Sequence, residues 1–228
     1  MAQISIVLPV LNEAQHLVSR LQALQGQRDR CQLLLVDGGS DDDSRRLAEP
    51  WVDKLILSPR GRALQMNAGA AQAEATVLLF LHVDTQLPAN AVDLIHQAMA
   101  QGFEWGRFDV ALDSPQPMFK LIALMMNLRS RLTGIATGDQ GLFMTQRAFQ
   151  AVGGFPAIAL MEDIAISRKL KQLGKPACLR TKILTSARRW QQHGILKTIL
   201  LMWRLRLAYF FGADPSDLSG RYYGNGKK

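Results

Sequence analysis

Short apolar runs alternate with segments of helical periodicity through the first half of the chain, and this alternation constrains the fold more than any other feature. A short apolar run bounded by turn residues is typical of a strand that is buried on both faces. Strands that alternate with helices of about a dozen residues form parallel βαβ units. The sequence therefore predicts an α/β fold in which parallel βαβ units form a doubly wound, mainly parallel sheet flanked by helices. The expected strands are Ile4–Val10, Leu33–Val36, Leu55–Leu57 and Thr76–Val83, and the expected helices are Glu13–Leu24, a helix from Ser40, Gly61–Ala73 and a helix from Pro88 to Ala100.

Two of these helices carry specific start signals. Ser40 is followed three residues later by Asp43, which is the spacing of a capping box with Asp in place of Glu. Pro88 is expected in the first turn of its helix, because the N–H group that proline lacks would have no partner within the helix there. The second half of the chain is less regular. It predicts strands at Trp105–Leu112 and Leu142–Met144, and helices at Met118–Leu132, Arg147–Val152 and Met161–Leu173.

Polar residues gather where each of the first four expected strands ends. The carboxyl ends of parallel strands share one edge of the sheet, and ligands of such sheets bind beyond that edge. The sequence thus predicts one site built from four segments. The segments are Asn12-Glu13, Asp37 to Asp42, Arg60-Gly61-Arg62 and His82 to Thr85.

Asp37 and Asp84 each follow an apolar strand, where a carboxylate is costly unless it is paired. Either Asp37 accepts hydrogen bonds from a nucleobase, or it belongs to a plain strand-to-helix turn. Asp84 suits Mg²⁺ or Mn²⁺, which bind one or two carboxylates together with substrate phosphates, or else a helix N-cap or a salt bridge. Arg60 and Arg62 suit phosphate, or a solvated basic loop. His82 suits a hydrogen-bond donor to a metal ligand, an Mn²⁺ ligand or a packed core histidine.

Glu162 and Asp163 begin an expected helix. Neighbouring positions on a helix point about 100° apart, so the two acids are expected to serve different roles. One can cap the helix while the other faces a cleft as a general base; the alternative is an ordinary pair of acids at a helix start. Arg188, Arg189 and Trp190 supply two guanidiniums and an aromatic ring, which suit a diphosphate clamp or a sugar-stacking wall, or else end a basic strand.

The chain of 228 residues has a net charge of +8, concentrated near its end, where ten Lys and Arg face two Asp and Glu from Cys178 onward. Such a charge attracts nucleic acid, anionic lipid or an anionic small substrate. Aromatic residues do not interleave with the basic ones over any long stretch, and no nucleic-acid-binding motif occurs. We therefore expect no nucleic-acid partner.

Residues 195–212, ILKTILLMWRLRLAYFFG, predict a basic amphipathic helix. It would bind a membrane surface as a peripheral helix, pack on the core as a terminal helix, or form a homodimer surface. No 18-residue stretch is free of charge, so no membrane span is expected. The start of the chain lacks the features of a signal peptide, and Cys31 and Cys178 fit a reducing compartment. These features predict a cytoplasmic protein, with the inner face of the membrane as its other expected location.

Five motifs occur in an order and spacing that resemble the family 2 glycosyltransferases, which have the GT-A nucleotide-diphospho-sugar transferase fold. They are IVLPVLNE, VDGGSDD, RGRALQMNAGA, LFLHVDT and MED, and the resemblance covers about Ile4 to Trp190. The segments GDQG and LMEDIAISRKL look most like the small stand-alone subgroup labelled rSAM/selenodomain-associated transferase 2. The resemblance implies a GT-A domain over residues 1–190 and a basic amphipathic helical extension over residues 191–228.

The resemblance also implies a reaction and residue roles. The reaction would be an inverting transfer from a nucleoside-diphosphate sugar, expected to be a UDP-sugar, to a hydroxyl acceptor. Asp163 would be the catalytic base, and Asp84 would hold Mn²⁺ or Mg²⁺ on the diphosphate. Pro9, Asn12, Glu13 and Asp37 would line the nucleoside pocket; Arg62, Asn67, His82, Val83, Arg189 and Trp190 would lie near the donor; and Asp139, Gln140 and Glu162 would form the acceptor side.

Two positions depart from the family's pattern. His82 stands in place of the first acid of the D-x-D motif, so the metal would rest on Asp84 nearly alone. Thr185 or Ser186 replaces the glutamine region of the Q-x-x-R-W motif, which argues against processive polymer synthesis. Three other functions compete with this one: a nucleotidyltransferase of similar fold, a nucleic-acid-binding module, and an inactive membrane-associated scaffold. The acceptor is a lipid-linked molecule, a small metabolite or a peptide.

Overall fold

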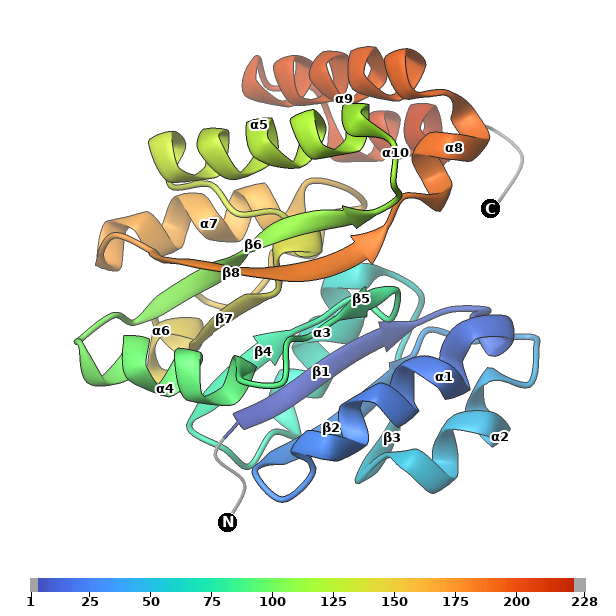
Figure 1. Ribbon diagram of the computed structural model, residues 1–228, viewed down its shortest axis with the longest axis vertical. Coiled ribbons are helices and arrows are strands. Elements are labelled where there is room, and N and C mark those ends of the chain that lie inside the picture. The colour runs from blue at the N-terminus through green and yellow to red at the C-terminus, as the bar shows by residue number, and fades with distance from the viewer. Residues whose placement is uncertain (1–3, 224–228) are drawn as a thin grey trace.

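The structure of the protein, a computed structural model, describes residues 4–223 except for the side chains of Arg189 and Tyr223. Within these residues, eight strands form one sheet in the order β3-β2-β1-β4-β7-β6-β8-β5 (Figure 1). The strands are β1 Ile4–Val10, β2 Cys31–Asp37, β3 Lys54–Leu57, β4 Val77–Phe80, β5 Thr85–Gln86, β6 Trp105–Asp113, β7 Leu142–Thr145 and β8 Ala177–Ser186.

The first four strands are parallel to one another, and the second half of the sheet is mixed. β1 pairs in parallel with β2 and β4, and β2 pairs in parallel with β3. β7 runs antiparallel to both β4 and β6, whereas β6 and β8 are parallel. The predicted α/β class with a mainly parallel sheet is therefore confirmed.

Helices cover both faces of this sheet. The helices are α1 Ala14–Leu24, α2 Ser44–Ala48, α3 Arg62–Ala71, α4 Ala91–Ala100, α5 Pro117–Thr133, α6 Gln146–Ala151, α7 Glu162–Leu173, α8 Arg188–His193, α9 Ile195–Phe210 and α10 Pro215–Tyr223, with short 3₁₀ segments at η1 Gln25–Gln27, η2 Glu49–Trp51 and η3 Gly138–Gln140. One apolar cluster joins α1 and α4 to one face of β1, and a second joins α3, α6 and α7 to the other face. β1 is therefore buried on both sides, as a continuous apolar strand requires.

β8 is the one long strand that the sequence pattern did not predict. It pairs with β6 over most of its length and places Thr185 beside Leu112. Arg180 and Lys182 interrupt its apolar residues, so neither the alternating nor the continuous apolar pattern of a strand is evident.

Three local expectations were wrong. Ser40 does not cap a helix: α2 begins at Ser44, with Asp43 at its N-cap and without a side-chain cap bond. β4 ends at Phe80 rather than Val83, so His82 to Thr85 form a turn that is closed by a hydrogen bond from Thr85 N to His82 O. Pro88 precedes α4, whose N-cap is Asn90.

The last three helices pack against α5 and α7. Ile195 and Ile199 of α9 share an apolar cluster with Phe119 and Ile122 of α5. Leu205 of α9 and Leu218 of α10 form another with Leu160, Met161 and Ile164. The C-terminal helices therefore lie over the carboxyl end of β8 and close one side of the predicted site.

Candidate active site

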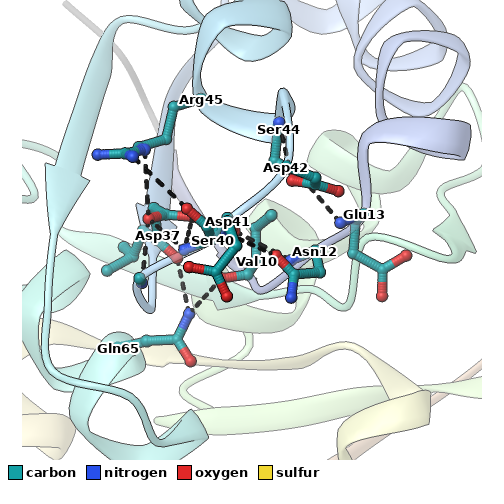
Figure 2. A network of polar contacts seen from close by, with 12 residues as sticks. Val10, Asn12, Glu13, Asp37, Ser40, Asp41, Asp42, Ser44, Arg45 and Gln65 are labelled. Carbon is teal, nitrogen blue, oxygen red and sulfur yellow. Dashed lines mark hydrogen bonds and ion pairs between the residues drawn. The ribbon is translucent and has the colours of Figure 1, made fainter.

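The loops after β1 and β2 are locked together by hydrogen bonds (Figure 2). The Asn12 and Glu13 amides donate to the hydroxyls of Ser40 and Ser44, each at 2.9 Å. In return, the Asp41 amide donates to Asn12 Oδ1 at 2.9 Å. Asn12 has a positive φ of 54°, which is uncommon for a residue other than glycine. These contacts hold Glu13 in place at the edge of the sheet.

Asp37 lies at the centre of this network, and its side chain is fully buried. Its carboxylate accepts hydrogen bonds from the Gly39 and Ser40 amides, each at 3.0 Å, and from the Ser40 hydroxyl. The Arg45 guanidinium lies 3.9 Å away. The Asp37 carboxylate therefore shapes the loop in this structure, and a nucleobase can reach it only by displacing one of these partners.

Two other predicted residues also hold the fold through their side chains. The Asn67 amide group pairs with both backbone groups of Phe155, at 2.8 and 3.0 Å. The fully buried Gln140 side chain accepts a hydrogen bond from the Thr137 amide at 3.2 Å and so caps η3. Gln65, which sequence reasoning missed, donates at 2.8 Å to the carbonyls of both Val10 and Val36 and ties β1 to β2. Its only sequence signal is a glutamine on the apolar face of α3.

A cavity of about 330 Å³ opens where the predicted strand ends meet the C-terminal helices. It is lined on one side by residues of the β1, β4 and η3 region and on the other by residues of β8, α8, α9 and α10. A smaller cavity of about 160 Å³ shares Glu13, Asp84 and Arg188 with it. The residues lining the larger cavity are Pro9, Glu13, Arg62, His82, Val83, Asp84, Leu112, Asp139, Thr185, Ser186, Arg188, Trp190, Gln192, His193, Thr198, Met202 and Tyr222.

Two carboxylates, those of Glu13 and Asp84, and the guanidinium of Arg188 lie together in this cavity. Burial raises the pKa of the Glu13 carboxyl above its ordinary value, Arg188 partly offsets this effect, and the nearby charge of Asp84 adds to it. Two neighbouring carboxylates repel each other unless a cation lies between them. The cavity therefore has the charge arrangement of a cation site beside an anion site.

His82 and Asp139 form a second polar pair on the cavity wall. The imidazole Nδ1 lies 3.4 Å from Asp139 Oδ1, and the other ring nitrogen is buried without a hydrogen-bond partner among the described residues. Partial burial raises the pKa of Asp139, but the hydrogen bond from His82 and the guanidiniums of Arg62 and Arg206 outweigh it, so the pKa lies below its ordinary value. The imidazole stands against Gly138, where an added Cβ would lie 2.5 Å from His82 Cε1.

Glu162 and Asp163 lie behind this pair. The buried Glu162 carboxylate is 3.7 Å from the guanidinium of Arg62, and burial together with the charge of Asp163 raises its pKa. Asp163 accepts a hydrogen bond from the Gly138 amide at 3.0 Å, so it is fixed directly behind the turn that carries Asp139. Met161, which precedes the pair, has a positive φ of 70°. Backbone strain of this kind is concentrated at functional sites.

Two guanidiniums from different helices approach the same acids. Burial lowers the pKa of Arg129 of α5 to about 10, and the charge of Arg206 of α9 adds to this effect, while Asp163 opposes it. Burial also lowers the pKa of Arg206, while the charges of Asp163 and Asp139 oppose this effect. The buried Nε atoms of both arginines have no partner among the described residues. The two cations offset the charge of Asp139 and Asp163.

The acids of the cavity fit a divalent cation that is shared with a phosphate ligand. In the described part of the chain, no three His, Cys, Asp or Glu side chains are grouped to hold a metal ion. Mg²⁺ and Mn²⁺ are commonly bound by one or two carboxylates plus substrate phosphates, and Asp84, Glu13 and Asp139 supply carboxylate oxygens in this cavity. These residues fit such an ion when phosphates are present.

The structure brings together about half of the residues that the sequence singled out. Pro9, Glu13, Arg62, His82, Val83, Asp84, Asp139 and Trp190 line the larger cavity, whereas Asn12, Asp37, Asn67, Gln140, Glu162 and Asp163 do not. The side chain of Arg189 lies outside the described residues. Arg188, one of the two guanidiniums of the ARRW segment, also lines the cavity. Sequence reasoning missed Gln192, His193, Thr198, Met202 and Tyr222, for which the one signal was the basic-aromatic segment after Ser186.

The family model for glycosyl transferase family 2 matches residues 5–151, which is more than half of the chain. No curated protein sequence matches the chain.

Solved glycosyltransferase structures share the fold at low sequence identity. S. aureus TarS 1–349 in complex with UDP-GlcNAc has a TM-score of 0.65 at 16% identity, over 81% of this chain and 58% of that one. The mannosyltransferase PcManGT from Pyrobaculum calidifontis, in complex with GDP-Man and Mn²⁺, has a TM-score of 0.66 at 18% identity, over 90% and 61%. Glucosyl-3-phosphoglycerate synthase from Mycobacterium tuberculosis, in complex with Mn²⁺ and UDP-Glc, has a TM-score of 0.60 at 17% identity, over 81% and 70%. The chain spans less than two thirds of the TarS and PcManGT chains.

Proposed function

Because this chain belongs to glycosyl transferase family 2, we propose that it transfers a sugar from a nucleoside-diphosphate sugar to a hydroxyl acceptor. The observation that carries the proposal is the cavity in which Asp84 and Glu13 meet Arg188 at the carboxyl edge of the sheet. A nucleoside diphosphate presents two phosphates, which a cation and guanidinium groups bind well. The solved relatives with UDP-GlcNAc, GDP-Man and UDP-Glc support this class of donor, and UDP is the proposed nucleotide.

We assign the donor to the larger cavity. Pro9 and Glu13 would face the nucleoside, while Arg62, His82, Val83 and Trp190 would face the diphosphate and sugar. Asn12 and Asp37 support this wall through the loop network and would contact the base after a local rearrangement. A divalent cation bound at Asp84 would neutralise charge that develops on the leaving diphosphate.

Asp163 is the proposed catalytic base. In the reaction, the acceptor oxygen attacks the anomeric carbon, its proton passes to the Asp163 carboxylate, and the bond from the anomeric carbon to the phosphate oxygen breaks. The products are the glycoside, inverted at that carbon, and a nucleoside diphosphate. Asp163 lies behind the cavity wall, tethered to Gly138. Catalytic contacts often form only in the substrate complex, so a shift of this turn would expose the carboxylate.

Asp139, Gln140 and Glu162 are the proposed acceptor side, with Asp139 in contact with the cavity and the other two holding the turn behind it. Residues 1–190 are the proposed GT-A domain. The extension over residues 191–228 contributes part of the cavity wall through Thr198, Met202 and Tyr222. The closer resemblance to the rSAM/selenodomain-associated subgroup and the non-processive reaction belong to the same proposal.

The base assignment is tested with Asp163→Asn. UDP-glucose, UDP-GlcNAc and GDP-mannose serve as probes with Mn²⁺, and slow transfer to water is followed as released UDP or GDP. The variant should bind the donors with affinity near that of the wild type and lose at least about a hundredfold in release rate. Asp93→Asn is the matched control, because Asp93 lies on α4 in a surface ion pair with Arg30.

Full turnover by Asp163→Asn would remove Asp163 from the base role. Release of pyrophosphate instead of a nucleoside diphosphate, from a nucleoside triphosphate and a sugar phosphate, would identify a nucleotidyltransferase.

A further inference from the structure

Exposed apolar side chains are concentrated on two helices. Outside α5, α9 and the adjoining Phe211, the exposed large apolar residues of the described chain are Leu57, Leu64 and Leu173. The others are Met118, Leu121, Leu124, Met125, Leu128 and Leu132 on α5, and Leu196, Leu200, Trp203, Leu207, Phe210 and Phe211 at α9. Scattered apolar residues on a surface are ordinary, but a contiguous group marks an interaction site.

On α9 these residues form one continuous stripe. Leu196, Leu200, Trp203, Leu207 and Phe210 follow the spacing of four and three residues that keeps side chains on one helix face. Trp203 is 71% exposed and Phe210 is 68% exposed. The opposite face is the buried one, with Thr198 and Leu205 packed inside. The outward stripe therefore does not serve the core.

α5 is fastened to the sheet by polar groups and carries its apolar stripe outward. The buried Asn127 side chain bonds to both backbone groups of Val110, at 2.9 and 3.0 Å, and the buried Arg107 donates to the Asn127 carbonyl at 3.2 Å. On the outside, Leu121, Met125, Leu128 and Leu132 repeat the spacing seen on α9. Leu132 is 77% exposed.

The two helices pack together through one apolar cluster, so their outward stripes lie on neighbouring elements. Ile122 and Met126 of α5 join Ile195 and Ile199 of α9 in that cluster, and both helices lie along the same border of the molecule (Figure 1). The α5–α9 face is defined here as the outward apolar residues of these two helices. The helices in the described part of the chain are all too short or too polar to cross a membrane.

The charges on this face have one sign. Neither α5 nor α9 contains an Asp or Glu, and the chain has none from Ile164 to Ala213. Lys120, Lys197 and Arg204 are exposed on these helices. Lys197 and Arg204 are seven residues apart and therefore flank the same side of the α9 stripe.

We propose that the α5–α9 face docks onto the surface of a membrane that contains anionic lipid. Leucine, phenylalanine and tryptophan side chains enter the acyl boundary of such a surface, while lysine and arginine contact the anionic headgroups. A second copy of the chain fits less well: in a two-fold dimer the same face meets itself, and Lys120, Lys197 and Arg204 would meet like charges with no acid on the face. Docking places the cavity across α9 from the lipid, because Thr198 and Met202 line the cavity from the other side of the same helix.

Co-sedimentation of the full chain with vesicles tests the proposal. The wild type should bind vesicles of phosphatidylcholine and phosphatidylglycerol strongly, bind pure phosphatidylcholine weakly, and lose affinity as salt rises. Leu200→Glu should lose most of the binding. Lys197→Glu combined with Arg204→Glu should weaken binding to the anionic vesicles by roughly twentyfold or more, with little change on neutral ones.

Leu57→Glu is the matched control, because it places the same charge on an equally exposed leucine outside the face. It should bind vesicles as the wild type does. Circular dichroism checks that each variant is folded. Calorimetry with UDP and Mn²⁺ reports donor binding, which every variant should keep, including those that no longer bind vesicles.

Three results would overturn the proposal: no binding of the folded wild type to anionic vesicles at low salt, equal binding by Leu200→Glu, or a dimer in analytical ultracentrifugation that Leu200→Glu converts to monomer. The last result would assign the face to a second copy of the chain. None of the three depends on whether the protein transfers a sugar.

Discussion

At the candidate site, the surroundings raise the pKa of one carboxyl group and lower the pKa of another nearby. Glu162 is buried next to Asp163, which raises its pKa, whereas the bonds and charges around Asp139 lower its pKa. Pairs of acids with diverging pKa values are a common feature of active sites, although ion-pair networks also produce them. Here the divergence separates a buried acid behind the wall from an ionised acid that faces the cavity.

Glu162→Gln should stabilise the protein above the ordinary carboxyl pKa of 4.5. A raised folded-state pKa means that the folded protein holds this proton more tightly than the unfolded chain. Stability is therefore lost as the pH rises from about 4.5 through the folded pKa. Urea unfolding of both proteins at several pH values checks this expectation: the difference should be small at pH 4 and should favour the variant at pH 8. A variant that is less stable at pH 8 would show that the ionised Glu162 is net stabilising.

Gly138→Ala should impair the site through His82. The new methyl group would occupy space held by the imidazole, so the ring must turn away from Asp139. We expect donor turnover to fall by roughly ten- to a hundredfold, since small displacements in an active site are costly. The double variant with His82→Ala is the control, because Gly138→Ala should cost little once the imidazole is gone. An undiminished effect in that background would mean that the glycine acts on Asp163 instead.

At the scale of elements, the carboxyl edge of the sheet depends on close packing of α3 on β1 and β2. A Cβ at Gly69 would lie 2.9 Å from Cγ2 of Val36 and closer still to Cγ1 of Val7. The glycine thus allows α3 to approach the sheet, and α3 in turn positions Arg62 and Gln65.

Gly69→Ala should destabilise the protein by about 1–3 kcal/mol, which is the usual cost of overpacking a core. Thermal unfolding measures the effect. Gly26→Ala is the matched control, because no atom lies within 4 Å of its added Cβ and its φ is not positive, so its stability should stay near that of the wild type. Equal stability of both variants would show that α3 can move away from the sheet at little cost.

For the molecule as a whole, the sequence predicts the features that short-range patterns determine. The apolar runs predict the four parallel strands. The ends of those runs predict the edge of the sheet at which Glu13, Arg62 and Asp84 lie. The pattern could not show that Ser40 turns its hydroxyl to Asp37 instead of capping α2, because both uses fit the same spacing. It could not show that Met202 and Tyr222 line the cavity, because that depends on how α9 and α10 pack over β8.

The most direct measurement is calorimetric titration of UDP and GDP into the wild type and Asp84→Asn, with and without Mn²⁺. We predict that at least one of the two nucleotides binds in the presence of Mn²⁺, and that the affinity falls about tenfold or more without the metal or in the variant. Mn²⁺ alone should bind weakly, since Asp84 and its neighbours need the phosphates to complete the site. Binding of neither nucleotide with Mn²⁺ present, or equal binding by Asp84→Asn, would contradict a nucleotide-sugar site at this edge of the sheet.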